Sequence, residues 1–113
     1  MLRMFLMMVS MAVWATAAVA DRMSGQEVAS LMAQGPLEFE AGSVGVFQGD
    51  GSFTFTHTSY NEAGTFKVFS NGNVEIHDKA TNKKVRFHFV RQSDGTPALI
   101  YAKGNGYQYR LKQ

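Results

Sequence analysis

Three histidines are the first candidates for chemistry in this chain, because an imidazole can move protons or bind a metal near neutral pH. His57 follows Phe53 and Phe55 at alternate positions, so it should share their sheet face at the end of a strand. His77 and His88 fall on the opposite face of later strands. No H-x-H or H-x-x-x-H spacing occurs, so the sequence predicts neither a metal nor another cofactor. We expect His57 to cap the edge of the core, with titration or binding at the mouth of a barrel as the alternative.

The other reactive side chains form no catalytic pattern. The chain has no cysteine, and no serine stands in the Gly-x-Ser-x-Gly pattern of a nucleophile elbow. Glu38 and Glu40 lie two residues apart on one strand, which resembles the carboxylate pair of a glycosidase. Charge on an edge strand, however, also prevents sheets from aggregating, and this explains the pair better. We therefore expect a protein that is not an enzyme.

Side chains that could bind a partner fall into two groups. One is a row of charged residues on the solvent face of three neighbouring strands. The other lies in a glycine-rich turn near the C-terminus, and rigidly held turns are common places for contacts. The candidate partner-binding residues are Lys67, Glu75, Arg86, Lys103, Asn105 and Tyr107.

These side chains must be positioned by hairpins, because Gly, Asn and Asp clusters separate short runs rich in Phe, Val, Thr and Tyr from residue 37 onward. The segments 49–51, 70–72 and 104–106 each fit a three-residue loop that ends in a glycine with positive φ. The segment 79–82 fits a four-residue loop. Each loop fixes the register of the strands that it joins.

The loop at 70–72 places Phe66 opposite Ile76 and Lys67 opposite Glu75, so that each face is chemically consistent. A two-residue turn would instead pair apolar with charged residues, and we reject it. The four-residue loop at 79–82 fixes the next register in the same way and places Glu75 opposite Arg86, which completes the charged row.

The remaining loops define the rest of the core face. The loop at 49–51 pairs Phe47 with Phe53. The loop at 104–106 pairs Tyr101 with Tyr109 and Leu99 with Leu111. The predicted core residues are Phe47, Phe53, Phe55, Phe66, Val68, Val74, Ile76, Val85, Phe87, Phe89, Leu99, Tyr101, Tyr109 and Leu111.

A short helix should open the domain at about residues 25–34, because Ser24 and Glu27 form a capping box and Gly35 follows. The fold class is therefore mainly β: this helix, then a six- or seven-stranded antiparallel meander that forms a curled sheet or a small open barrel. A flat sheet with the helix on one face is the alternative.

The first twenty residues have the pattern of an export signal. Arg3 precedes an almost wholly apolar run, and Ala18 and Ala20 give the small-x-small cleavage pattern. We expect residues 1–20 to be removed, leaving residues 21–113 as a single β-rich domain that is periplasmic or secreted and not stably inserted in a membrane. Without Arg3 the chain has ten Lys and Arg against nine Asp and Glu, and this near balance excludes a nucleic-acid footprint.

The capped helix, the Asp-Gly turn and the phrase Gly64-Thr65-Phe66-Lys67-Val68 resemble a group of small secreted β-meander proteins of Gram-negative bacteria. That group usually carries Gly-x-Trp and a later Cys, whereas Phe66 stands at the aromatic place here. The resemblance implies the compartment and the fold, since the group has no settled activity. The phrase at residues 103–107 is also similar to the Ser-Gly-x-x-Tyr loop of the inhibitors of C-type lysozyme, although the Ser is missing.

Taken together, these features predict a non-enzymatic module that binds an envelope or secreted protein. An inhibitor of an envelope-attacking hydrolase such as lysozyme is one alternative. A carrier of a small ligand is a second, although a small barrel with this many Phe side chains should be filled. A structural component of the envelope is a third.

Overall fold

The computed structural model of this protein describes residues 21–113, and the predicted signal peptide, residues 1–20, lies outside them. Within residues 21–113 the chain forms one helix, α2 (Gly25–Ala33), and nine strands. No helix in this part of the chain is long and apolar enough to span a bilayer. The strands are β1 (Asp21–Arg22), β2 (Leu37–Glu38), β3 (Val44–Phe47), β4 (Ser52–Thr56), β5 (Asn61–Val68), β6 (Val74–Asp78), β7 (Lys84–Arg91), β8 (Pro97–Tyr101) and β9 (Tyr109–Arg110).

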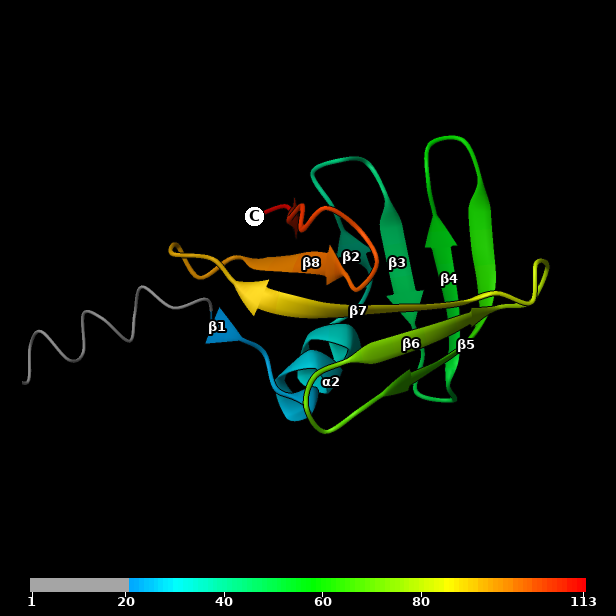
Figure 1. The fold of residues 1–113 in the computed structure, drawn as a ribbon, viewed down its shortest axis with the longest axis horizontal. Coiled ribbons are helices and arrows are strands. Elements are labelled where there is room, and N and C mark those ends of the chain that lie inside the picture. The colour runs from blue at the N-terminus through cyan, green and yellow to red at the C-terminus, as the bar shows by residue number, and fades with distance from the viewer. Residues whose placement is uncertain (1–20) are drawn as a thin grey trace, which may run out of the picture.

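Strands β2 to β9 pair antiparallel in the order of the sequence, and β1 pairs with β7 beside this path. The sheet curls into a half-barrel in which β3 and β4 run across the direction of β7 and β8 (Figure 1). A bridge between Phe39 and Leu111 joins the two ends of the path. The predicted mainly-β fold with a curled meander is confirmed. The described path has eight strands rather than six or seven, because the short segments at both ends pair as separate strands.

Helix α2 begins at the predicted capping box. The Glu27 N–H donates to Ser24 Oγ over 3.2 Å, and the Ser24 N–H donates to Glu27 Oε1 over 3.0 Å. Val28 and Met32 are buried on the side of the helix that faces the sheet. The helix therefore closes one end of the half-barrel, where it contacts β3 and β5 (Figure 1).

The predicted registers of three hairpins are confirmed. Phe47 pairs with Phe53, Lys67 with Glu75 and Glu75 with Arg86. The loops at 49–51 and 70–72 end in glycines with positive φ, as expected. In these loops the residue before the loop donates its N–H to the carbonyl of the residue after it and accepts from the N–H of the final glycine. Residues 40–42 and 93–95 form two further loops of this kind, which were not predicted.

The predicted register of the last hairpin is wrong. Leu99 pairs with Tyr109 rather than with Leu111, and residues 102–108 form a longer loop than 104–106. The shift of two residues keeps Tyr109 on the core face, because side chains alternate with period two. In this register the Leu111 N–H donates to the Pro97 carbonyl over 3.0 Å, and on its other side Leu111 forms the bridge with Phe39, which connects the end of β9 to the first strands of the meander.

All of the predicted core residues are buried or half-buried in one cluster. Phe47 is at its centre, with ring centroids at 6.0 Å from Phe53, 5.2 Å from Phe66 and 6.3 Å from Phe87. Val28 and Met32 complete this cluster from α2. The prediction that the helix packs on the core through Val28 and Met32 is confirmed, whereas Met23, Leu37 and Phe39, in or next to β1 and β2, were not predicted as core.

Candidate functional site

A cavity of about 240 Å³ is lined in part by residues of the β2–β3 and β4–β5 loops. These loops lie at the end of the half-barrel away from α2 (Figure 1). Its floor consists of core side chains from most strands of the sheet, so the cavity reaches into the half-barrel. Three polar side chains lie at its rim: Ser43, His57 and Glu62. The apolar and aromatic lining consists of Phe39, Ala41, Phe55, Tyr60, Ile76, Val85, Leu99, Tyr101 and Tyr109.

The three rim residues form a continuous hydrogen-bonded chain. Ser43 Oγ lies 2.9 Å from His57 Nδ1, and His57 Nε2 lies 2.8 Å from Glu62 Oε1. An ionised carboxylate can only accept hydrogen bonds, so Nε2 carries a proton. When His57 is neutral, its Nδ1 accepts the Ser43 hydroxyl proton. The proton of Ser43 is then engaged, and its oxygen lone pairs can accept a donor from a bound molecule.

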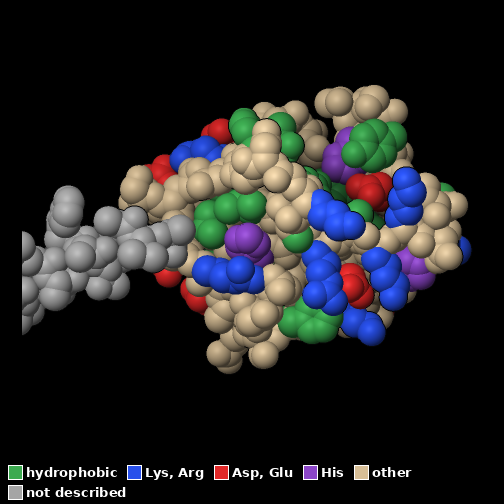
Figure 2. All heavy atoms as spheres, in the orientation of Figure 1, with side chains coloured by type: hydrophobic (Ala, Val, Ile, Leu, Met, Phe, Trp, Pro, Cys, Tyr) green, Lys and Arg blue, Asp and Glu red, His purple; other side chains and the backbone are tan. Residues whose placement is uncertain are grey.

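The His57 ring is held between two aromatic rings. Its centroid lies 4.6 Å from that of Phe55 and 4.4 Å from that of Tyr60. Figure 2 shows histidine, aromatic and acidic side chains gathered over the tip of the β4–β5 hairpin. Stacking on both faces and hydrogen bonds at both nitrogens fix the orientation of this imidazole.

A two-residue turn between β4 and β5 brings Glu62 next to His57. The His57 N–H donates to the Tyr60 carbonyl over 2.8 Å, which closes a tight turn at the end of β4. Phe55 therefore pairs with Glu62, and the carboxylate lies on the core face of β5. We expected His57 to cap the edge of the core, with a place at the mouth of a barrel as the alternative, and we predicted neither of its partners. The sequence did contain a signal for Glu62: a two-residue turn after β4 pairs Glu62 with the core residue Phe55 and so places its carboxylate on the core face.

Burial and the nearby Glu62, Tyr60 and Tyr109 raise the pKa of Tyr101 to about 12. Burial is the largest of these causes, because it disfavours the charged phenolate. Tyr101 therefore lines the cavity as a neutral group that can both donate and accept a hydrogen bond.

The hydrogen-bonded side chains of Ser43, His57 and Glu62 have the connectivity of a serine, histidine and acid triad. Acyl transfer also needs N–H groups aimed at the developing oxyanion. Beside Ser43, the Phe39 N–H donates to the Ser43 carbonyl and the Gly42 N–H donates to the Phe39 carbonyl, both over 2.9 Å. The turn thus uses these two donors. Among residues 21–113, no three His, Asp or Glu side chains converge as a metal site would require.

The charged row forms on the outer face of β5, β6 and β7. Arg86 Nε donates to Glu75 Oε2 over 2.9 Å, and the Arg86 guanidinium lies 5.3 Å from the centre of the Phe69 ring. The Arg86 hydrogen bond, with the charges of Arg86, Lys84 and Lys67, lowers the pKa of Glu75. Figure 2 shows Lys and Arg side chains gathered around acidic ones over these strands.

The other three predicted partner-binding residues, Lys103, Asn105 and Tyr107, lie in the loop between β8 and β9 and are exposed. The Tyr107 N–H donates to Asn105 Oδ1 over 3.0 Å, and the Tyr107 ring packs on Tyr109 at 4.6 Å. This loop is thus anchored to the strand that lines the cavity.

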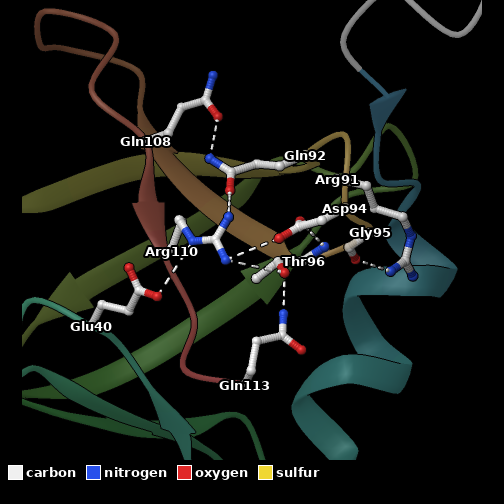
Figure 3. A network of polar contacts seen from close by, with 9 residues as sticks. All are labelled: Glu40, Arg91, Gln92, Asp94, Gly95, Thr96, Gln108, Arg110 and Gln113. Carbon is white, nitrogen blue, oxygen red and sulfur yellow. Dashed lines mark hydrogen bonds and ion pairs between the residues drawn. The ribbon is translucent and has the colours of Figure 1, made fainter.

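A second polar network joins the edge strands (Figure 3). Arg110 is at its centre and pairs with Asp94 at 3.1 Å and with Glu40 at 3.4 Å. It also donates to Gln92 Oε1 over 2.5 Å. These partners come from the β2–β3 and β7–β8 loops, so the network holds β9 in place and is structural.

A shallow hollow of about 890 Å³ lies between α2 and the C-terminus. Its walls include the exposed polar side chains of Gln26, Ser30 and Gln34 and an ion pair of 3.6 Å between Glu27 and Arg91. No aromatic side chain is among its described lining residues, in contrast to the cavity at the other end. The cavity with His57 at its rim is therefore the candidate site.

Comparison of the chain with family models, with curated proteins and with solved structures finds no match in any of the three. Function must therefore be argued from the site itself.

Proposed function

We propose that this protein is a small exported domain that binds a small, mainly apolar molecule in the half-barrel. The observation that carries this proposal is the cavity of about 240 Å³, lined by aromatic side chains and rimmed by the Ser43, His57 and Glu62 chain. Apolar walls with a few convergent polar groups are the usual composition of a ligand site. Since a cavity of about 150 Å³ can hold benzene, this one suits a ligand of about ten non-hydrogen atoms.

Filling the cavity tests this proposal. Val85 is half-buried and lines the cavity, whereas Val68 is half-buried on the same sheet face outside its lining. A library of small aromatic fragments would be screened by ligand-detected NMR against the wild type, Val85→Phe and Val68→Phe. We expect some fragments to bind the wild type and Val68→Phe but not Val85→Phe. Binding that survives in Val85→Phe, or an absence of binding to the wild type, would contradict the proposal.

A second function, binding of an envelope or secreted protein, is favoured by the charged row. The Arg86 side chain is 54% exposed and covers the partly exposed ring of Phe69, with Lys67 and Lys84 nearby. An exposed arginine on an aromatic ring is typical of partner surfaces. Affinity capture from an envelope extract with the wild type and Glu75→Lys tests this. A protein retained by the wild type and lost by the variant would support the second function, and equal retention would count against it.

A further inference from the structure

We propose that the cavity selects an organic ammonium ion with a small apolar body. This inference rests on the proposed function and specifies its ligand class. Three features carry it: the Glu62 carboxylate in a lining without Lys or Arg, the hydrogen-bond acceptor that Ser43 offers when His57 is neutral, and the aromatic walls.

The carboxylate of Glu62 gives the cavity its charge. Its side chain is 19% exposed, and its ion-pair partner in the described part of the chain is His57. A neutral His57 satisfies one carboxylate oxygen but leaves the negative charge uncancelled. Among the described residues that line the cavity, none is Lys or Arg. Beside a neutral His57, a partly desolvated carboxylate is unfavourable, and a bound cation would provide the charge that pairs with it.

The Ser43 hydroxyl adds a directional contact. When His57 is neutral, the Ser43 hydroxyl donates to its Nδ1, and the free lone pairs of Ser43 can accept an N–H from an ammonium group. A bound carboxylate would find an acceptor at Ser43 and a like charge at Glu62. The polar rim therefore discriminates against anions.

The walls suit a cation as well as an apolar body. Tyr60, Tyr101 and Tyr109 place aromatic rings around the cavity, and the centroids of Tyr101 and Tyr109 lie 5.7 Å apart at a steep angle. Ring faces attract ammonium groups, and aromatic cages with nearby carboxylates are a common way to bind them. The aliphatic side chains of Ile76, Val85 and Leu99 line the deeper part of the cavity, where the apolar body would lie.

Three probes of nearly equal size and different charge test the inference: 2-phenylethylammonium, 2-phenylethanol and phenylacetate. Calorimetric titration of the wild-type protein at neutral pH should give an affinity for the ammonium at least about tenfold above that for the alcohol, from the added ion pair and cation–π contact. Phenylacetate should bind most weakly. The preference for the ammonium should shrink as salt is added, because the contact is partly exposed.

Glu62→Gln separates charge from shape. This variant keeps the size of the side chain, so 2-phenylethanol should bind as it does to the wild type, and that binding also shows that the cavity is intact. The preference for the ammonium should fall to within about twofold in Glu62→Gln. Glu38→Gln, which removes an exposed carboxylate away from the cavity, should leave the preference unchanged.

The outcomes distinguish this inference from the proposed function. Equal binding of the ammonium and the alcohol to the wild type, or tighter binding of phenylacetate, would overturn the ammonium inference while leaving a ligand site in place. A preference that persists in Glu62→Gln would also overturn it. Failure of all three probes to bind the folded wild type would count against both proposals.

Discussion

The two ends of the half-barrel differ in how they are completed. At the closed end, α2 covers the sheet with Val28 and Met32, and Phe47 contacts neighbouring rings on several strands. At the open end, no such cover occurs within residues 21–113, and His57 and Glu62 stand at the rim of a cavity instead. The same curled sheet thus provides a packed core at one end and a recognition site at the other.

This difference implies that the closed end contributes more to the free energy of unfolding than the open end does. Close packing of apolar groups stabilises the closed end, since an interior without voids maximises burial and dispersion contacts. A cavity lined by half-buried side chains loses part of those contacts. Polar groups at functional sites commonly carry such a cost.

Truncation of Phe47 should have the largest effect on the closed end. Phe47→Ala removes a ring that is 6% exposed and contacts neighbouring rings, so we expect a loss of about 3–5 kcal/mol in the free energy of unfolding. Urea denaturation followed by circular dichroism measures it. A loss of less than about 1 kcal/mol would show that this end is not the packed core.

A matched pair of valine truncations compares the two ends directly. Val28 is fully buried on the side of α2 that faces the sheet, whereas Val85 is half-buried and lines the cavity. We expect Val28→Ala to cost about 2 kcal/mol and Val85→Ala about 1 kcal/mol or less, since the second change only enlarges an existing cavity. Equal costs in the same denaturation experiment would remove the distinction between the ends.

The phenol of Tyr101 should make the open end sensitive to alkali. Its pKa is raised to about 12 in the fold by burial and by Glu62, whereas an unfolded tyrosine titrates near pH 10. The stability that comes from a raised pKa is fully present below pH 10 and is lost as the pH rises towards 12. Tm should therefore fall more steeply between pH 10 and pH 12 in the wild type than in Tyr101→Phe. Parallel curves for the two proteins would argue against burial of this phenol.

The charged row should matter least for stability. Glu75→Lys breaks an exposed pair with Arg86, and exposed pairs contribute little because water and salt screen them. We expect the unfolding transition to move only slightly and the binding of fragments at the open end to be unchanged. A large fall in Tm would place Glu75 in the core and contradict the assigned register.

Much of the fold could be predicted, because local chemistry determines the hairpins. The glycines at 51 and 72 and the alternation of apolar residues gave registers that the structure confirms. The last hairpin could not be obtained in this way. Its seven-residue loop has no local signal of comparable strength, and its register depends on the bridge from Leu111 to Phe39, which lie far apart in the chain.

The candidate site was less predictable than the fold. The parity of β4 indicated the rim position of His57, which the structure confirms. Ser43 lies in the β2–β3 loop and Glu62 lies on β5. Their contacts with His57 therefore depend on two strand registers, that of β3 with β4 and that of β4 with β5. The cavity depends on how the sheet curls, and hairpin pairings alone do not determine that curvature.

The most direct test of the account is a map of where a small ligand binds. Backbone and side-chain NMR signals of the labelled protein would be followed during titration with 2-phenylethylammonium. The account predicts shifts that centre on Ser43, His57, Glu62 and Tyr101, with the signals of α2 nearly unchanged. Shifts confined to α2 or to the Lys67, Glu75 and Arg86 face, or no shifts at all, would contradict the assignment of the open end as the ligand site.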